Sequence, residues 1–163
     1  MRKYSTTLAV AGLVLAGSAA SANAASLAAA TYASIGMVTA SNGANCGQIG
    51  LTQGASSNSF VNYPGATKTG LTIYTPGPGN LQLCTGFPAV PAGGLNGFNA
   101  SANCGIYTVN GNAPPALVAF NFTSTVIDAK SAVGTTTVAI PVTAVLGAGC
   151  TATITNTIVR TGK

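Results

Sequence analysis

The sequence predicts an all-β protein, an antiparallel β-sandwich with long loops and two disulfide bonds. Short apolar or alternating runs recur along the chain, and clusters of Gly, Pro, Asn and Ser separate them. The chain also carries four cysteines, an even number. No run combines helical spacing with a cap at both ends, so we expect a domain built from sheets.

Residues 1–24 are predicted to be a secretory signal peptide. Arg2 and Lys3 precede an apolar run, and a stretch of small residues ends at Ala24. The apolar run is shorter than the roughly 20 residues of a membrane-spanning helix, and no later stretch fills that length without polar interruption. We therefore expect a mature chain, residues 25–163, that forms one β domain without a transmembrane segment. The short leader is typical of bacteria, and the expected location is the periplasm, the cell surface or the exterior of the cell.

The first residues of the mature chain, 25–39, mix alanines with residues that favour extended structure. We consider this segment an N-terminal extension or a donor strand, which could add to the open sheet of a neighbouring molecule.

Strands are expected where apolar residues alternate with polar ones or form short runs. The expected ranges are 48–53, 59–63, 70–75, 80–84, 116–127, 135–146 and 150–161. A turn at 75–80 and a three-residue hairpin loop at 147–149 connect some of them, and residues 86–105 form the longest expected loop. In the last strand, Ala152, Ile154, Asn156 and Ile158 share one face and threonines occupy the other.

The four cysteines are expected to form structural disulfides, because an exported chain with an even number of cysteines favours them. Cys46 and Cys104 each lie in the tetrapeptide Ala-Asn-Cys-Gly. If this marks an internal repeat, each would pair with the next cysteine along the chain, giving Cys46–Cys84 and Cys104–Cys150. The two other connectivities stay open. A zinc site is not expected, because no two cysteines lie two to four residues apart.

The charged residues of the mature chain are few and scattered. Four basic residues and one acidic residue give a net charge of +3 (four minus one), from Lys68, Lys130, Arg160, Lys163 and Asp128. The chain has no His, and Asp128 is its one carboxylate side chain. We therefore expect no enzyme, since general acids and bases are lacking, and no metal, cofactor or nucleic-acid site. Asp128 and Lys130 are expected to form an exposed salt bridge in a turn.

The leader, the size, the four cysteines and the Thr-, Ala- and Gly-rich strands of residues 25–163 resemble small exported surface proteins of Gram-negative bacteria. Pilus and spore-coat-U-like subunits, and alkane-oxidation activator proteins of the PraA/PraB type, are the groups that the chain resembles. The resemblance implies a location at the cell surface and assigns no residue roles.

Two functions are expected from these observations. The first is a non-enzymatic structural protein of the cell surface or extracellular matrix that self-associates as a pilus, filament or biofilm subunit. Strands 116–127 and 150–159 lack the charged residues that usually block pairing between sheet edges. The alternative is a monomeric binding module for a glycan or a hydrophobic small molecule, which would use the loop 86–105 with Phe87, Phe98 and nearby Tyr107.

Overall fold

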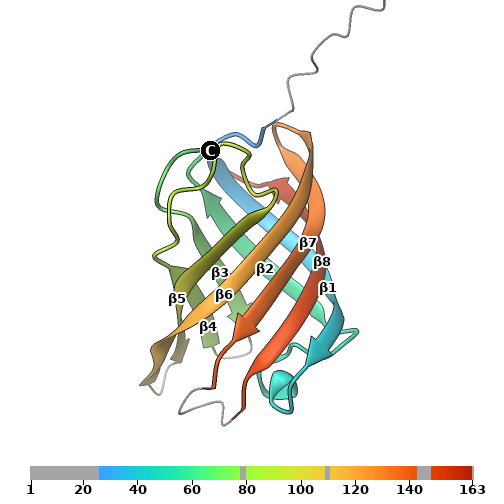
Figure 1. Cartoon of the computed structure of the whole chain (residues 1–163), viewed down its shortest axis with the longest axis vertical. Coiled ribbons are helices and arrows are strands. Elements are labelled where there is room, and N and C mark those ends of the chain that lie inside the picture. The colour runs from blue at the N-terminus through green and yellow to red at the C-terminus, as the bar shows by residue number, and fades with distance from the viewer. Residues whose placement is uncertain (1–25, 78–79, 109–110, 143–147, 163) are drawn as a thin grey trace, which may run out of the picture.

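A computed structural model describes residues 26–77, 80–108, 111–142 and 148–162, which form a closed antiparallel β-barrel (Figure 1). Each strand pairs with the next one along the chain, and the last pairs with the first. The strands are β1 (Ala30–Asn42), β2 (Ser56–Tyr63), β3 (Thr72–Gly77), β4 (Asn80–Thr85), β5 (Phe98–Thr108), β6 (Gly111–Asp128), β7 (Ser131–Ile140) and β8 (Cys150–Arg160). The predicted leader lies outside the described residues.

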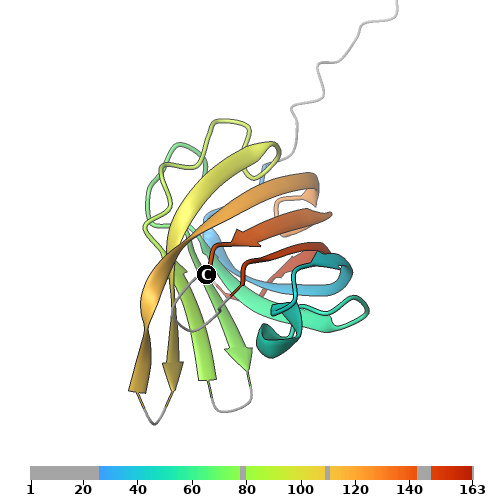
Figure 2. The same ribbon diagram turned by 60° about the horizontal axis from the view of Figure 1, so that its bottom comes forward.

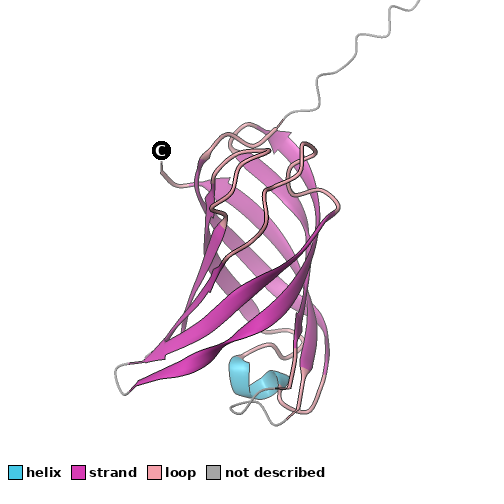
Figure 3. Cartoon of the chain, turned by 60° about the vertical axis from the view of Figure 1, so that its left-hand side comes forward, coloured by secondary structure: helices cyan, strands magenta, loops and turns pink. Residues whose placement is uncertain are grey.

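In an antiparallel barrel, successive connections between strands lie at alternate ends (Figure 3). The two ends of this barrel differ because they carry different connecting segments. One end carries the start of β1, the loops 64–71 and 86–97, the β6–β7 turn and the end of β8; we call it the loop-covered end. The other carries the short 3-10 helix η1 (Cys46–Ile49), and we call it the helix end (Figure 2).

The prediction of an all-β, antiparallel fold is confirmed, but the sandwich is wrong. Strands β1 and β8 pair from Tyr32 opposite Arg160 to Asn42 opposite Thr151, and this pairing closes one sheet on itself. Strands in a sandwich and in a small barrel show the same alternation of buried and exposed residues. The sequence pattern therefore could not distinguish the two architectures.

The faces predicted for the last strand are confirmed on β8, and β6 shows the same alternation. On β6, Val118, Phe120 and Phe122 are buried, while the residues between them point to solvent. On β8, Ala152 and Ile158 are buried and the alternating threonines face outward.

Three predicted boundaries are corrected. Residues 48–53 belong to η1 and the turns after it rather than to a strand. The loop predicted at 86–105 ends at residue 97, because β5 begins at Phe98. The strand predicted at 135–146 ends at Ile140, immediately before Pro141, which cannot donate to a strand ladder. The predicted loop 147–149 begins at Gly147, which lies outside the described residues.

The segment considered as a donor strand is part of this chain's own barrel. From Ala30 onward it forms β1, which is hydrogen-bonded to β2 on one side and to β8 on the other. The two strands expected to have free edges, β6 and β8, likewise have a partner on both sides. Closure therefore removes the edges on which the prediction of strand addition depended.

The preferred disulfide pairing is also wrong. Cys46 bonds to Cys150, with 5.1 Å between Cα atoms, and Cys84 bonds to Cys104, with 4.1 Å. Cys84 and Cys104 lie directly opposite each other on β4 and β5. The register of the sheet, rather than the repeated tetrapeptide, determines which sulfurs meet.

Candidate functional site: a cavity inside the barrel

Side chains from all the strands of the barrel enclose a cavity of about 120 Å³. Most of its lining is apolar: Leu51, Val61, Leu71, Ile73, Cys84, Leu95, Cys104, Val118, Phe120, Phe122, Val138, Ile140, Ile154 and Ile158. These residues come from the inward-facing positions of the strands and from three connecting segments, which contribute Leu51, Leu71 and Leu95. An eight-stranded barrel has an interior wide enough to be filled by side chains or to hold one small ligand. Here the side chains leave part of it empty.

Loop residues fill the barrel at the loop-covered end. Leu71, Phe87, Val90 and Leu95 are at most 5% exposed, although their segments lie outside the strands. Val90 is held by hydrogen bonds of 2.9 and 2.8 Å to the backbone of Lys68 and Thr67 in the loop that precedes β3. Phe87 packs on Phe120, with ring centroids 5.1 Å apart. These contacts cover the cavity from this side.

Toward the helix end, the residues that line the cavity are half-buried rather than buried. Leu51, Ser57, Thr75, Gln82 and Ile140 all belong to this group. Thr75 and Gln82 lie opposite each other on β3 and β4, near the end of that hairpin. The exposure gradient indicates that a ligand would enter from the helix end.

A polar group lies in the wall of the cavity at the middle of β8. Asn156 Nδ2 donates hydrogen bonds to Ser34 Oγ at 2.9 Å and to Thr136 Oγ1 at 3.4 Å. Asn156 stands opposite Gly36 on β1 and opposite Gly134 on β7. A Cβ atom on Gly36 would lie 3.0 Å from Asn156 Cβ and 2.7 Å from Thr155 O, so the close approach of β1 and β8 here requires glycine.

Two further polar groups line the cavity between β2 and β4. The hydroxyls of Ser59 and Thr75 are hydrogen-bonded to each other at 2.8 Å. Gln82 makes no side-chain hydrogen bond to any described residue, so its carboxamide keeps both a donor and an acceptor available. None of the described residues that line the cavity carries a charge.

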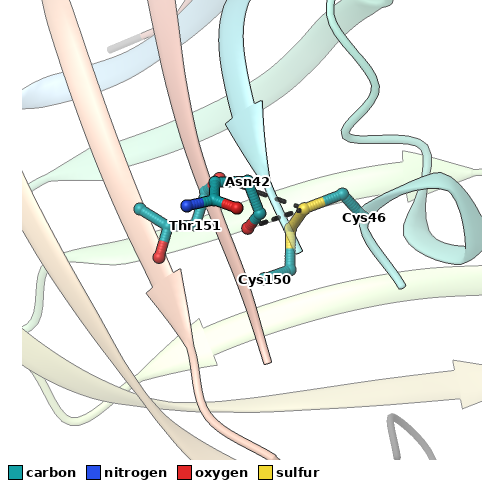
Figure 4. Close-up of a disulfide and its surroundings, with 4 residues drawn as sticks. All are labelled: Asn42, Cys46, Cys150 and Thr151. Carbon is teal, nitrogen blue, oxygen red and sulfur yellow. Dashed lines mark hydrogen bonds between the residues drawn. A yellow bond between two sulfur atoms is a disulfide. The ribbon is translucent and has the colours of Figure 1, made fainter. Parts of the chain in front are cut away.

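The sulfurs of Cys84 and Cys104 belong to this wall, since both residues line the cavity. The other disulfide lies outside it, at the helix end, where it links the start of η1 to the start of β8. Cys46 Sγ lies 3.4 Å from Asn42 O and 3.9 Å from Thr151 O (Figure 4). Because a sulfur in a disulfide carries no hydrogen, these are contacts that hold the bridge against the β1–β8 pair.

The aromatic residues proposed for a loop-based binding site do not form an exposed site, because Phe87 and Phe98 both pack on Phe122. Phe87 and Phe98 are both 5% exposed and belong to the core. Tyr107 is 39% exposed and lies near the end of β5 away from that loop. Sequence reasoning missed the cavity itself. The polar residues Ser57, Ser59 and Asn156, at strand positions that should face the core, are the feature of the sequence that could have indicated a cavity.

An open depression of about 490 Å³ on the outer wall lies over β5, β6 and β7. Its rim includes the outward-facing Asn99, Ser101, Asn121 and Thr137, with a hydrogen bond between the side chains of Asn99 and Asn121. Phe120 is the one aromatic residue among its described lining, and it is 7% exposed. Because sugar rings usually stack on exposed aromatic faces, this depression supports a glycan site less well than the cavity supports an apolar ligand.

The predicted salt bridge between Asp128 and Lys130 is absent from the described residues. Asp128 Oδ1 instead accepts hydrogen bonds from the Lys130 backbone N–H at 2.7 Å and the Ser131 hydroxyl at 2.9 Å. These two bonds hold the pKa of the Asp128 carboxyl below its usual range, and the bond from the Lys130 N–H has the larger effect. Asp128 therefore stabilises the β6–β7 turn, far from the cavity mouth.

No helix in the described part of the chain is both long and apolar enough to cross a membrane. Comparison with protein-family models, with curated proteins and with solved structures finds no match to this chain.

Proposed function

We propose that this protein is an exported, non-enzymatic binding protein that holds a small, mainly apolar molecule inside its barrel. The observation that carries the proposal is the cavity of about 120 Å³, lined mainly by apolar side chains and covered at one end. Ligand sites are typically concave and apolar with a few polar groups that orient the ligand, and this interior has that composition.

The volume limits the size of the ligand. An engineered cavity of about 150 Å³ in another protein binds benzene. A cavity of about 120 Å³ therefore suits a ligand with roughly the bulk of one six-membered ring. A longer molecule would extend through the half-buried residues at the helix end.

Export is part of the proposal. Two disulfides join all four cysteines, and such bonds persist in oxidising compartments such as the periplasm or the cell exterior. The predicted signal peptide supports the same location.

Self-association, the first function expected from the sequence, is the second candidate here. Exposed residues on the outer wall of the barrel support it, instead of strand edges. Ile35, Met37 and Phe60 are 61%, 54% and 46% exposed on the paired strands β1 and β2. Exposed apolar clusters of this kind are frequent at protein contacts. Electron microscopy and sedimentation over a range of concentrations should show filaments or oligomers that Phe60→Thr abolishes. A monomer at every concentration would exclude this candidate.

A cavity-filling substitution tests the binding proposal. Ser57 faces the cavity and the adjacent Ser56 faces solvent, so Ser57→Phe and Ser56→Phe add the same ring on opposite sides of β2. In an NMR titration with toluene, we expect saturable shifts of cavity residues in the wild type and in Ser56→Phe, and at least a tenfold weaker affinity in Ser57→Phe. Equal affinities of the two variants, or no saturable binding by the wild type, would refute the proposal.

A further inference from the structure

The charged side chains of the described residues all lie at one end of the barrel. Lys68 lies in the loop between β2 and β3, Asp128 and Lys130 flank the β6–β7 turn, and Arg160 ends β8. The β2–β3 loop, the β6–β7 turn and the end of β8 all lie at the loop-covered end (Figure 1). Lys68, Asp128 and Lys130 are exposed, and the half-buried Arg160 donates from Nε to Gly162 O at 2.9 Å.

This distribution leaves the cavity without a counter-ion. A carboxylate or an ammonium group that enters an apolar site loses its hydration, and burial is tolerated when an opposite charge or several strong hydrogen bonds replace it. The described lining offers neutral amides and hydroxyls alone. A charged ligand would therefore be rejected, whereas a neutral polar group needs a single hydrogen bond.

The cavity does offer that hydrogen bond. Both amide hydrogens of Asn156 are engaged, by Ser34 and Thr136, and no hydrogen bond from a described residue reaches its Oδ1. The Gln82 carboxamide, on the opposite side of the barrel, has no partner among the described side chains. Each is half-buried, where an unmade hydrogen bond is more costly than in water.

We propose that the ligand is an uncharged molecule with an apolar body and one oxygen group, and that the cavity discriminates against carboxylates and amines. A hydroxyl would donate to Asn156 Oδ1 or to the Gln82 carboxamide, whereas a carbonyl oxygen would accept from the Gln82 amide alone, because both Asn156 amide hydrogens are engaged. This inference rests on the proposed function, since it names the chemical class of ligand for the same cavity.

Four compounds of nearly equal size test it: toluene, benzyl alcohol, benzoate and benzylamine, titrated at pH 7 into ¹⁵N-labelled full-length mature protein. The side-chain amide signals of Asn156 and Gln82 report on the site directly. We expect benzyl alcohol to bind at least tenfold more tightly than benzoate and benzylamine, and to shift one of the two amide signals more than toluene does.

Variants then test the assigned groups. Asn156→Leu and Gln82→Met remove one carboxamide each, and Asn58→Leu removes an outward-facing asparagine as the matched control. We expect at least one inward variant to lower the affinity for benzyl alcohol relative to toluene by threefold or more, and Asn58→Leu to leave that ratio unchanged. Gln82 is half-buried near the helix end, so its variant keeps the test valid if Asn156→Leu fails to fold.

The outcomes separate the two proposals. If benzoate or benzylamine binds as tightly as benzyl alcohol, the discrimination against charge is wrong and the binding function stands. If both inward variants keep the wild-type ratio, the assignment to Asn156 and Gln82 is wrong. If none of the four compounds binds, the proposed function itself fails.

Discussion

Cys46 and Cys150 join the two strands at which the barrel closes, since Cys46 follows β1 and Cys150 begins β8. The bridge spans 104 residues of sequence, whereas Cys84–Cys104 spans 20. In the chain-entropy model, constraint of the unfolded chain stabilises by about 4.7 kcal/mol for the longer loop and about 3.3 kcal/mol for the shorter one.

We therefore expect Cys46→Ser/Cys150→Ser to lower the free energy of unfolding by about 1.4 kcal/mol more than Cys84→Ser/Cys104→Ser does. Urea denaturation of the two double variants measures this difference. A larger loss from the shorter bridge would indicate that its position in the cavity wall matters more than the length of its loop.

Tyr32 anchors the start of β1 to the β6–β7 turn. Its hydroxyl donates to Ala28 O at 2.6 Å, and Ala129 O lies 3.2 Å away. Because the ring is fully buried, Tyr32→Phe should lower the free energy of unfolding by about 1 kcal/mol. Thermal or urea denaturation at pH 7 checks the loss, and no loss would mean that this anchor contributes nothing.

Alkaline pH should destabilise the protein through the same residue. Burial raises the pKa of Tyr32. Two causes raise the pKa of Tyr63: burial, which is the larger, and the nearby Tyr32. Below the unfolded value of about 10, both tyrosines are protonated in both states and stability is unaffected. Above it, the unfolded chain releases these protons first, so stability falls as the pH rises. Denaturation between pH 8 and pH 11 should show a shallower fall for Tyr32→Phe; a fall equal to that of the wild type would contradict this.

Gly134 should not tolerate a side chain. A Cβ atom there would clash with Thr123 O and lie 2.6 Å from Ser124 Cα, both backbone atoms of the neighbouring strand. We expect Gly134→Ala to cost about 1–3 kcal/mol of unfolding free energy. The control is Gly47→Ala, where the nearest atom would be Thr52 Cγ2 at 3.5 Å, an ordinary contact. Equal stability of the two variants would show that the β6–β7 pair adjusts without cost.

Asp128 should titrate below the usual range of an aspartate, because the Lys130 N–H and then the Ser131 hydroxyl stabilise its charged form. Its contribution to stability is present above the unfolded pKa and is lost as the pH falls through the lower, folded pKa. Carboxyl ¹³C NMR can follow this group, since the sequence has no other acidic side chain. Ser131→Ala should raise the pKa toward its ordinary value. An unchanged pKa would exclude the hydroxyl as a cause.

Much of this molecule followed from local sequence. The alternation in β8 correctly predicted which side chains share a face, because successive residues of a strand point to opposite sides. The Gly- and Pro-rich segments correctly separated most strands. Position 98 was misplaced in a loop because the first part of β5, residues 98–105, is rich in Asn, Ser and Ala and has none of the β-branched residues that usually indicate a strand.

The tertiary structure decided what local pattern does not specify. Whether β8 pairs with β1 depends on the twist and stagger accumulated over eight strands, and that closure replaced the sandwich and its open edges with an enclosed interior. Register placed Cys84 opposite Cys104, and it placed Asn156 between two glycines. The amino-acid sequence by itself determined a disulfide-linked β protein with few charged residues. The long-range pairing of its strands determined that this protein encloses a cavity.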